Sequence, residues 1–200
     1  YQTSQNLYGD EDERTLEALI ALGLSYLDDG QSEMAQGIAT SLLSLNWSEE
    51  NGPAYDLYID VLCFQADIQH NKDLYPQELV IRKHVFSLLE ELSGSVSSQA
   101  IMARCALAFC LEKMKRYKQA LDHYQVVRSY LDSDEQFATE AEKIGLLVHI
   151  GRCYRKLGNF DDAVVLYHWA HKQADKLFGP ASSLAQKMKK LVGVIDGVNQ

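Results

Sequence analysis

The sequence predicts an all-α fold built from antiparallel helix pairs. Only three prolines and twelve glycines occur in 200 residues, so long segments run without a helix breaker. Apolar residues make up 46% of the chain, which is enough for one well-packed domain and too much for a disordered chain. Small residues also recur at the places where two paired helices would have to touch.

Residues 147–170 carry this pattern most clearly, as two apolar helical segments on either side of Gly158. Gly151 and Ala163 have little or no side chain, so two antiparallel helices can approach closely there. Gly158 suits the left-handed backbone that commonly ends a helix, and Asn159 can cap the helix that follows. Large side chains expected to fill the space beside the contact are Tyr154, Phe160 and Tyr167.

The same spacing predicts two more helix pairs, over residues 15–47 and 100–131. In the first, Gly23 and Ala35 take the two small positions, Asp29-Gly30 ends the first helix and Ser32 caps the second. In the other, Ala108 and Ala120 take the small positions. Ala108 lies 43 residues before Gly151 and 85 after Gly23, so the period is 42–43 residues. We expect Trp47 to pack against the edge of the first pair.

Residues 55–93 fit the pattern least well. Leu62-Cys63 and Ala66 can take the offsets of Leu22-Gly23 and Tyr26, but no glycine turn follows on schedule. We therefore expect a degenerate pair with a lengthened turn over residues 70–75, after which Pro76 opens the second helix.

The rest of the chain completes one domain over residues 1–200. Residues 1–14 are predicted to be the end of a preceding unit, and residues 134–177 a fourth helix pair that starts at a capping box of Ser133 and Gln136. Residues 181–198 are predicted to form a closing helix, because a bare last pair would expose apolar surface. The chain begins at Tyr1 rather than Met, so we expect it to be a piece of a longer protein.

Seven offsets in residues 150–170 resemble the tetratricopeptide repeat: Ile150-Gly151, Tyr154, Gly158, Phe160, Ala163, Tyr167 and Ala170. Two further stretches resemble the junctions between repeats in kinesin light chain and related bacterial and fungal proteins: Leu7, Gly9, Asp10, Thr15 and Leu16, and Leu177, Gly179, Pro180 and Leu184. The resemblance implies a right-handed α-solenoid that serves as a scaffold for protein–protein interaction.

Charge and cysteine usage limit the function classes. Residues 1–60 hold twelve Asp and Glu against one basic residue, Arg14, a net charge of −11, whereas residues 61–200 hold eighteen Lys and Arg against sixteen acids, a net charge of +2. The acidic leading part argues against a nucleic-acid surface there. No apolar run is as long as a membrane span. The four cysteines form no CxxC pair, which favours buried free thiols and a cytosolic or nuclear setting.

No catalytic, cofactor or metal pattern stands out, so we expect a protein that is not an enzyme. The sequence has no phosphate-binding glycine loop and no GxSxG, HExxH or EF-hand motif. His168 and His171 lie three residues apart on one predicted helix, but no third metal ligand accompanies them.

The resemblance also implies a concave groove lined by the first helix of each repeat. Aligning the predicted repeats places four residues at one position of this groove: Leu24, Phe64, Phe109 and Arg152. With Arg155 and Lys156, they form an apolar stripe that runs into a basic end. The repeats that bind the acidic tails of heat-shock chaperones use Lys and Asn residues to clamp a carboxylate. Those residues are missing at the equivalent positions of this sequence.

We therefore predict that the groove binds a peptide or partner segment with apolar anchors and an acidic residue. Two alternatives stay open: the apolar groove residues are covered by neighbouring helices or by another part of a longer protein, or the segment is a regulatory part of a larger signalling or transcriptional protein whose groove engages another domain of the same chain.

Overall fold

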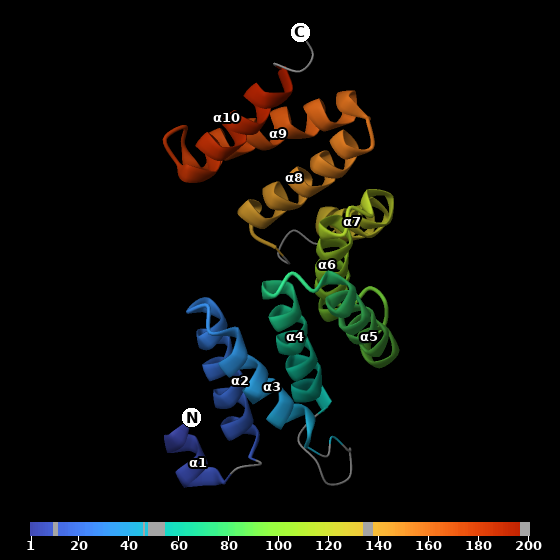
Figure 1. The fold of residues 1–200 in the computed structure, drawn as a ribbon. Coiled ribbons are helices and arrows are strands. Elements are labelled where there is room, and N and C mark those ends of the chain that lie inside the picture. Colours follow the sequence, from blue (N-terminus) through green and yellow to red (C-terminus); the bar gives the residue numbers. More distant parts are fainter. Residues whose placement is uncertain (10–11, 46, 48–54, 134–137, 197–200) are drawn as a thin grey trace. The chain divides into compact units, whose positions relative to one another are not determined.

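The computed structural model describes residues 1–9, 12–45, 47, 55–133 and 138–196. In these residues every regular element is an α-helix, as Figure 1 shows. The helices are α1 (Gln2–Tyr8), α2 (Glu13–Asp28), α3 (Ser32–Leu43), α4 (Tyr55–Asn71), α5 (Tyr75–Ser93), α6 (Ser98–Lys113), α7 (Tyr117–Ser133), α8 (Glu140–Lys156), α9 (Phe160–Phe178) and α10 (Ser183–Asp196).

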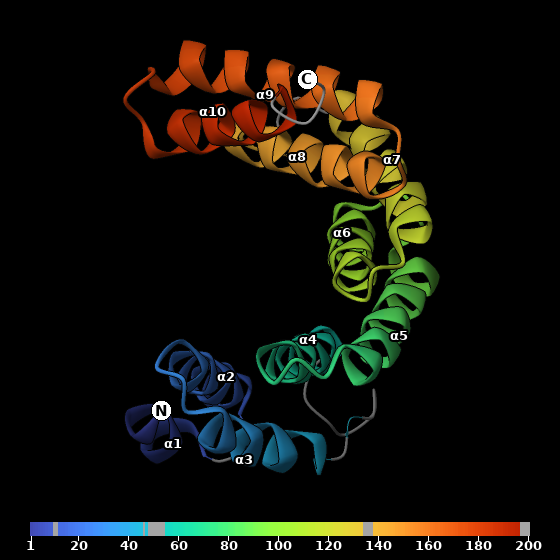
Figure 2. The same ribbon diagram turned by 45° about the horizontal axis from the view of Figure 1, so that its top comes forward.

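The chain divides into two compact units, Tyr1–Glu91 and Leu92–Gln200. We refer to them as unit 1 and unit 2. In unit 1, apolar side chains of α2, α3 and α4 form one core. In unit 2, α9 packs against both α8 and α10 (Figure 2), and α6 packs against α7. That residues 1–200 act as one domain stays a prediction.

Four residues with left-handed backbone turn the chain from the first helix of each pair to the second. These turn residues are Gly30, Asp73, Lys115 and Gly158, with φ of 74°, 56°, 61° and 87°. After each one, the next N–H donates to a carbonyl oxygen five residues back, as from Gln31 to Tyr26 at 2.7 Å and from Leu74 to Gln69 at 2.9 Å. This is the Schellman closure of a helix. The turn residues lie 43, 42 and 43 residues apart, which confirms the predicted period.

The second pair departs from its prediction. Its turn is not lengthened: α4 ends at Asn71, α5 begins at Tyr75, and Asp73 adopts the conformation that Gly30 adopts in the first pair. Counting back from the turn residues, Ala66 takes the position of Gly23, so the predicted alignment of Cys63 with Gly23 was wrong by three residues. The error arose because a short polar side chain can occupy a left-handed turn in place of glycine.

The small residues of the first helices lie inside the molecule, as predicted. Gly23, Ala108 and Gly151 are all buried. A Cβ atom added at Gly151 would lie 2.9 Å from Cε1 of Tyr167, and one added at Gly23 would lie 2.2 Å from Cζ of Phe64. A large ring therefore sits where a side chain would otherwise be.

Several helix ends differ in detail from the sequence prediction. A capping box starts α8, but it is made by Thr139 and Glu142. Ser133 is instead the last residue of α7 and donates to the Tyr130 carbonyl, while Gln136 lies outside the described residues. Asp10 of the predicted junction and residues 197–198 of the predicted closing helix also lie outside them.

Of two predicted caps, Asn159 takes its position without a side-chain bond, whereas the prediction for Ser32 was wrong by one residue. Asn159 is the N-cap of α9, and Ser32 is the first residue of α3 after the N-cap Gln31. Trp47 packs against the first pair as expected: its Nε1 donates to the Leu42 carbonyl at 3.0 Å.

The last helix covers α9 in the predicted manner. Ala185 and Met188 of α10 are buried in the core of α8 and α9, whereas Lys187, Lys189 and Lys190 are exposed.

Candidate interaction surface

The first helices of the pairs present equivalent residues, once each is counted from its turn residue. Six residues before the turn stand Leu24, Asp67, Phe109 and Arg152. The predicted row held Phe64 in place of Asp67, and this membership was wrong because the second pair had been aligned three residues out of register. Phe64 is 1% exposed and packs over Gly23, so it is a core residue rather than a free surface anchor.

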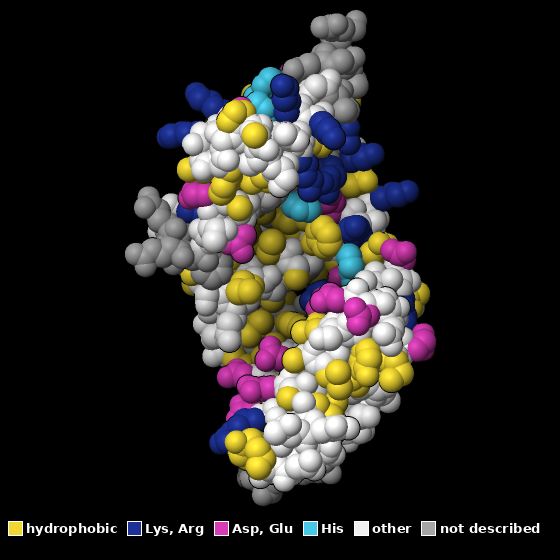
Figure 3. All heavy atoms as spheres, turned by 90° about the vertical axis from the view of Figure 1, so that its left-hand side faces the viewer, with side chains coloured by type: hydrophobic (Ala, Val, Ile, Leu, Met, Phe, Trp, Pro, Cys, Tyr) yellow, Lys and Arg dark blue, Asp and Glu magenta, His cyan; other side chains and the backbone are white. Residues whose placement is uncertain are grey.

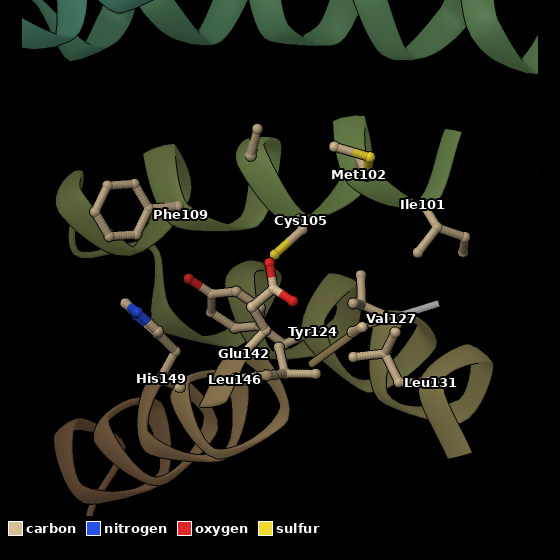
Figure 4. Close-up of a pocket in the computed structure, with 13 residues that line it drawn as sticks. Ile101, Met102, Cys105, Phe109, Tyr124, Val127, Leu131, Glu142, Leu146 and His149 are labelled. Carbon is tan, nitrogen blue, oxygen red and sulfur yellow. The ribbon is translucent and has the colours of Figure 1, made fainter. Parts of the chain in front are cut away.

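Unit 2 contains a cleft of about 530 Å³ between α6, α7 and α8, which we call the α6–α8 cleft. Figure 4 shows Phe109 and His149 at one end and Ile101 at the other. Met102 at its edge is 64% exposed. The lining is mostly apolar: Ile101, Met102, Cys105, Ala106, Phe109, Val127, Leu131, Ala138, Gly145 and Leu146, with Tyr124, Glu142 and His149 as the polar members.

A buried carboxylate, Glu112, holds one end of this cleft together. It accepts a hydrogen bond from the Tyr124 hydroxyl at 3.0 Å and from Nη1 of Arg152 at 2.6 Å, and its Oε2 lies 2.8 Å from Nδ1 of His149. Burial alone would raise the pKa of Glu112, but the bonds from His149 and Arg152 hold that pKa below its ordinary value. One anion thus links α6, α7 and α8.

Aromatic contacts fix the orientation of the side chains around Glu112. The rings of Phe109 and His149 meet edge to face with centroids 5.4 Å apart, and Lys113 Nζ lies 5.1 Å from the centroid of the Phe109 ring. Burial and the Glu112 carboxylate raise the pKa of Tyr124, so this hydroxyl remains a donor. Phe109 is therefore half-buried and held in place, with part of its ring facing the cleft.

The last turn of α8 is basic, as predicted, and its three cations differ in their surroundings. Arg152 is bonded to Glu112, whereas Lys156 is exposed. The Nε atom of Arg155 is buried and has no hydrogen-bond partner among the described residues. In Figure 3, Lys and Arg side chains gather on the upper part of the face shown.

Unit 1 has a smaller cleft of about 320 Å³ between α2 and α4, which we call the α2–α4 cleft. Its apolar side chains include Leu24, which is 40% exposed, and the buried Phe64. Three carboxylates also line it: Glu17, Asp60 and Asp67. Leu24 and Phe64 thus line the same cleft, while Phe109 lies in unit 2.

The partners of Glu112 were not identified from the sequence. Tyr124 comes from α7, and His149 is 37 residues further along the chain than Glu112. The signal available in the sequence was a glutamate at a position where the first pair has Leu27.

The comparisons with known proteins agree with this geometry. A family model of the tetratricopeptide repeat (TPR) matches residues 146–169, which span most of α8 and the first half of α9. The match covers one helix-turn-helix unit of the chain. No sequence among curated proteins matches the chain significantly.

Solved structures with a similar fold include BtubC (BKLC) from P. vanneervenii, with a TM-score of 0.76 and 12% identity over 92% of this chain and 72% of that one. A kinesin-light-chain-like protein of Podosopora anserina with nearly identical TPR-like repeats has a TM-score of 0.74 and 12% identity, over 94% of this chain and 89% of that one. At this identity the likeness establishes the fold, and it confirms the predicted α-solenoid of TPR-like helix pairs.

The cysteines of the chain have the properties of packing residues. All four are free, with Cys110 and Cys153 buried and Cys63 and Cys105 half-buried. Burial raises the pKa of Cys153 to about 12, so its sulfur stays a protonated thiol at neutral pH. In the described part of the chain, no group of three or more His, Cys, Asp or Glu side chains is placed to hold a metal ion. No helix in that part is long and apolar enough to cross a membrane.

Proposed function

We propose that this chain is a non-catalytic protein-interaction module and that the α6–α8 cleft binds an extended or helical segment of a partner. The observation that carries the proposal is this cleft itself, because it opens about 530 Å³ of largely apolar space on the face formed by the first helices. TPR-like folds are generally scaffolds for protein–protein contacts, which supports the proposal that this chain is an interaction module.

Apolar burial supplies the affinity. Met102 is 64% exposed and Phe109 is half-buried, so a leucine or aromatic side chain of the partner would remove both from water. Each Å² of apolar surface buried contributes roughly 25 cal/mol before the costs of ordering the partner.

The charges beside the cleft favour a partner with an acidic residue. Arg155 and Lys156 follow the cleft at the end of α8, and the buried Nε of Arg155 lacks a hydrogen-bond partner among the described residues. A carboxylate on the partner would pair with the exposed ammonium group of Lys156. Arg152 contributes charge as well, but its bond to Glu112 gives it a structural role.

Replacement of Phe109 tests the proposal. A synthetic helical peptide of leucine and glutamate serves as the probe, with backbone amide shifts mapped by NMR on the whole chain. We expect the shifts to fall on α6 and α8, and Phe109→Ala to weaken binding about tenfold while the helical circular dichroism is unchanged. Val126→Ala is the control, because Val126 is an exposed apolar residue of α7 outside the cleft lining.

Lys156→Glu should weaken binding of the leucine–glutamate peptide about threefold. The same variant should strengthen binding of a leucine–lysine peptide to this cleft. Reversal of charge at Arg152 is the poorer test, because it would set a second carboxylate beside Glu112. Loss of helicity in Phe109→Ala would mean that Phe109 serves the core. Intact affinity would mean that the cleft is not the binding site.

A second candidate is a regulatory segment of a longer signalling or transcriptional protein, in which another domain of the same protein occupies the groove. The acidic first sixty residues favour it, since twelve acids face one arginine there. In that case residues 1–200 alone would bind the leucine–glutamate probe more tightly than the longer protein does. The free thiols favour a cytosolic or nuclear setting for either module.

A further inference from the structure

The α2–α4 cleft of unit 1 occupies the same helix face as the α6–α8 cleft but is more acidic, because three carboxylates line it and, among the described residues, Glu142 is the only carboxylate that lines the other. Counted from the turn residues, the positions thirteen, ten, nine and six before the turn line it in both helices: Glu17, Ile20, Ala21 and Leu24 in α2, and Asp60, Cys63, Phe64 and Asp67 in α4. In α6 the same positions are Met102, Cys105, Ala106 and Phe109, which all line the other cleft.

We propose that the α2–α4 cleft is a second interaction site, which takes an aliphatic side chain of a protein segment with a lysine or arginine beside it. The inference rests on the proposed function only in treating the chain as an interaction module. Its site, its ligand charge and its residues are separate from those of unit 2.

The apolar part of the cleft has room for one anchor. Leu24 is 40% exposed at its edge, and Ile20, Leu57 and Phe64 line it as buried side chains. Phe64 is fixed because its ring lies where Gly23 leaves space. The cleft, of about 320 Å³, therefore has a rigid apolar floor.

Charge complementarity identifies the kind of partner. Glu17 and Asp60 stand at equivalent positions of neighbouring helices, and in the described residues neither has a hydrogen-bond or ion-pair partner. Asp67 differs, because Arg82 neutralises it at 2.5 Å. Burial raises the pKa of Asp60, and repulsion from Asp56 and Glu17 raises it further. A cationic group placed between Glu17 and Asp60 would relieve that repulsion.

A metal ion does not fit these carboxylates. Among the residues that the structure describes, no three His, Cys, Asp or Glu side chains come close enough together to hold one. Nucleic acid is excluded by charge, because residues 1–60 carry twelve acids and one arginine. A basic protein segment with an aliphatic side chain would complement both the apolar floor of the cleft and the carboxylates of Glu17 and Asp60.

The test uses three synthetic helical peptides of equal length on the whole chain: leucine with lysine, serine with lysine, and leucine with glutamate. We expect the leucine–lysine peptide to shift backbone amides of α2 and α4. The double variant Glu17→Gln, Asp60→Asn should weaken it about fivefold. Asp122→Asn, an exposed carboxylate of α7, should leave it unchanged.

Leu24→Ala tests the apolar half and should also weaken the leucine–lysine peptide severalfold, with circular dichroism confirming that helicity is kept. The proposal is overturned if the serine–lysine peptide binds equally well, or if Asp122→Asn acts like the double variant, since either result means nonspecific attraction to a chain of net charge −9. Shifts confined to other helices overturn it too. The leucine–glutamate peptide tests the α6–α8 cleft of unit 2 separately. A negative result at one cleft therefore does not affect the conclusion about the other.

Discussion

The first two helix pairs of unit 1 share one turn geometry but are held by different chemistry. Equivalent positions lie six and three residues before the turn residue and five and nine after it. In α2 and α3 they are Leu24, Leu27, Ala35 and Ala39, whereas in α4 and α5 they are Asp67, His70, Glu78 and Arg82. An apolar contact between two helices has thus been replaced by four ionisable side chains.

The charged set is fully connected. Glu78, only 1% exposed, lies 2.9 Å from Nδ1 of His70 and 3.4 Å from Nε of Arg82, and Arg82 reaches Asp67 at 2.5 Å. A buried carboxylate is tolerable only with such partners, because desolvation of an unpaired charge is very costly. The comparison teaches that the position of alanine in the repeat accepts a carboxylate when it is bonded both by its own helix, here through Arg82, and by the facing helix, here through His70.

The largest effect on stability is expected when a glutamate like Glu78 is placed in the first pair, where His70 and Arg82 have no counterparts. Ala35→Glu buries a carboxylate in the apolar core that Ala35 shares with Leu27, so we expect a loss of at least ~4 kcal/mol in the free energy of unfolding of unit 1. Urea unfolding and amide exchange of α2 and α3 measure it. The control is Met34→Glu, at a 54% exposed neighbour, which should change stability by less than ~0.5 kcal/mol. A small loss for Ala35→Glu would mean that this position does not require an apolar residue.

Glu78→Ala should have the next largest effect. It leaves Arg82, whose side chain is 12% exposed, without its helix neighbour, so we expect a loss of about 3 kcal/mol. The bond to Asp67 keeps the loss below that of Ala35→Glu. The double variant Glu78→Ala, Arg82→Leu should recover most of it, because both charges are then absent; no recovery would mean that the ion pair is not what the first change broke.

Gly23→Ala is expected to cost about 2 kcal/mol, the smallest of the three effects. The added Cβ would lie 2.2 Å from Cζ of Phe64, so the ring must move within a packed core. Gly37→Ala is the matched control, since a Cβ there meets nothing within 4 Å and should stabilise α3 by about 1 kcal/mol. In the second pair, the position equivalent to Gly23 is already occupied by an alanine, Ala66. If the two variants had equal stability, the close approach of Phe64 to Gly23 would carry no energetic weight.

Sequence spacing predicted the fold well where glycine occupies the turn. Gly30 and Gly158 placed the first and fourth pairs correctly, and Lys115 with Ala108 placed the third. Asp73 hid the turn of the second pair, and the resulting shift of three residues put Phe64 on the predicted surface. An error of three residues is nearly one helical turn, so the apolar pattern looked acceptable in either register.

The candidate sites were less predictable than the fold. Helix periodicity identified the first-helix face and the basic end at Arg152, Arg155 and Lys156. It could not show that Arg152 is bonded to Glu112, because a contact across 40 residues depends on how neighbouring pairs pack. The equivalence of Glu17 with Asp60 in the α2–α4 cleft likewise emerged only after the register was corrected.

The sequence by itself determined the helical class, the spacing of 42–43 residues and the need for small side chains between paired helices. These are local properties, set by backbone conformation, side-chain volume and helix period. Tertiary structure alone decided that Leu24 is exposed while Phe64 is buried, and that Glu112 is satisfied by residues from two other helices. Burial and ion pairing depend on which side chains the next helix brings near, and that is a property of the packed repeats rather than of any one segment.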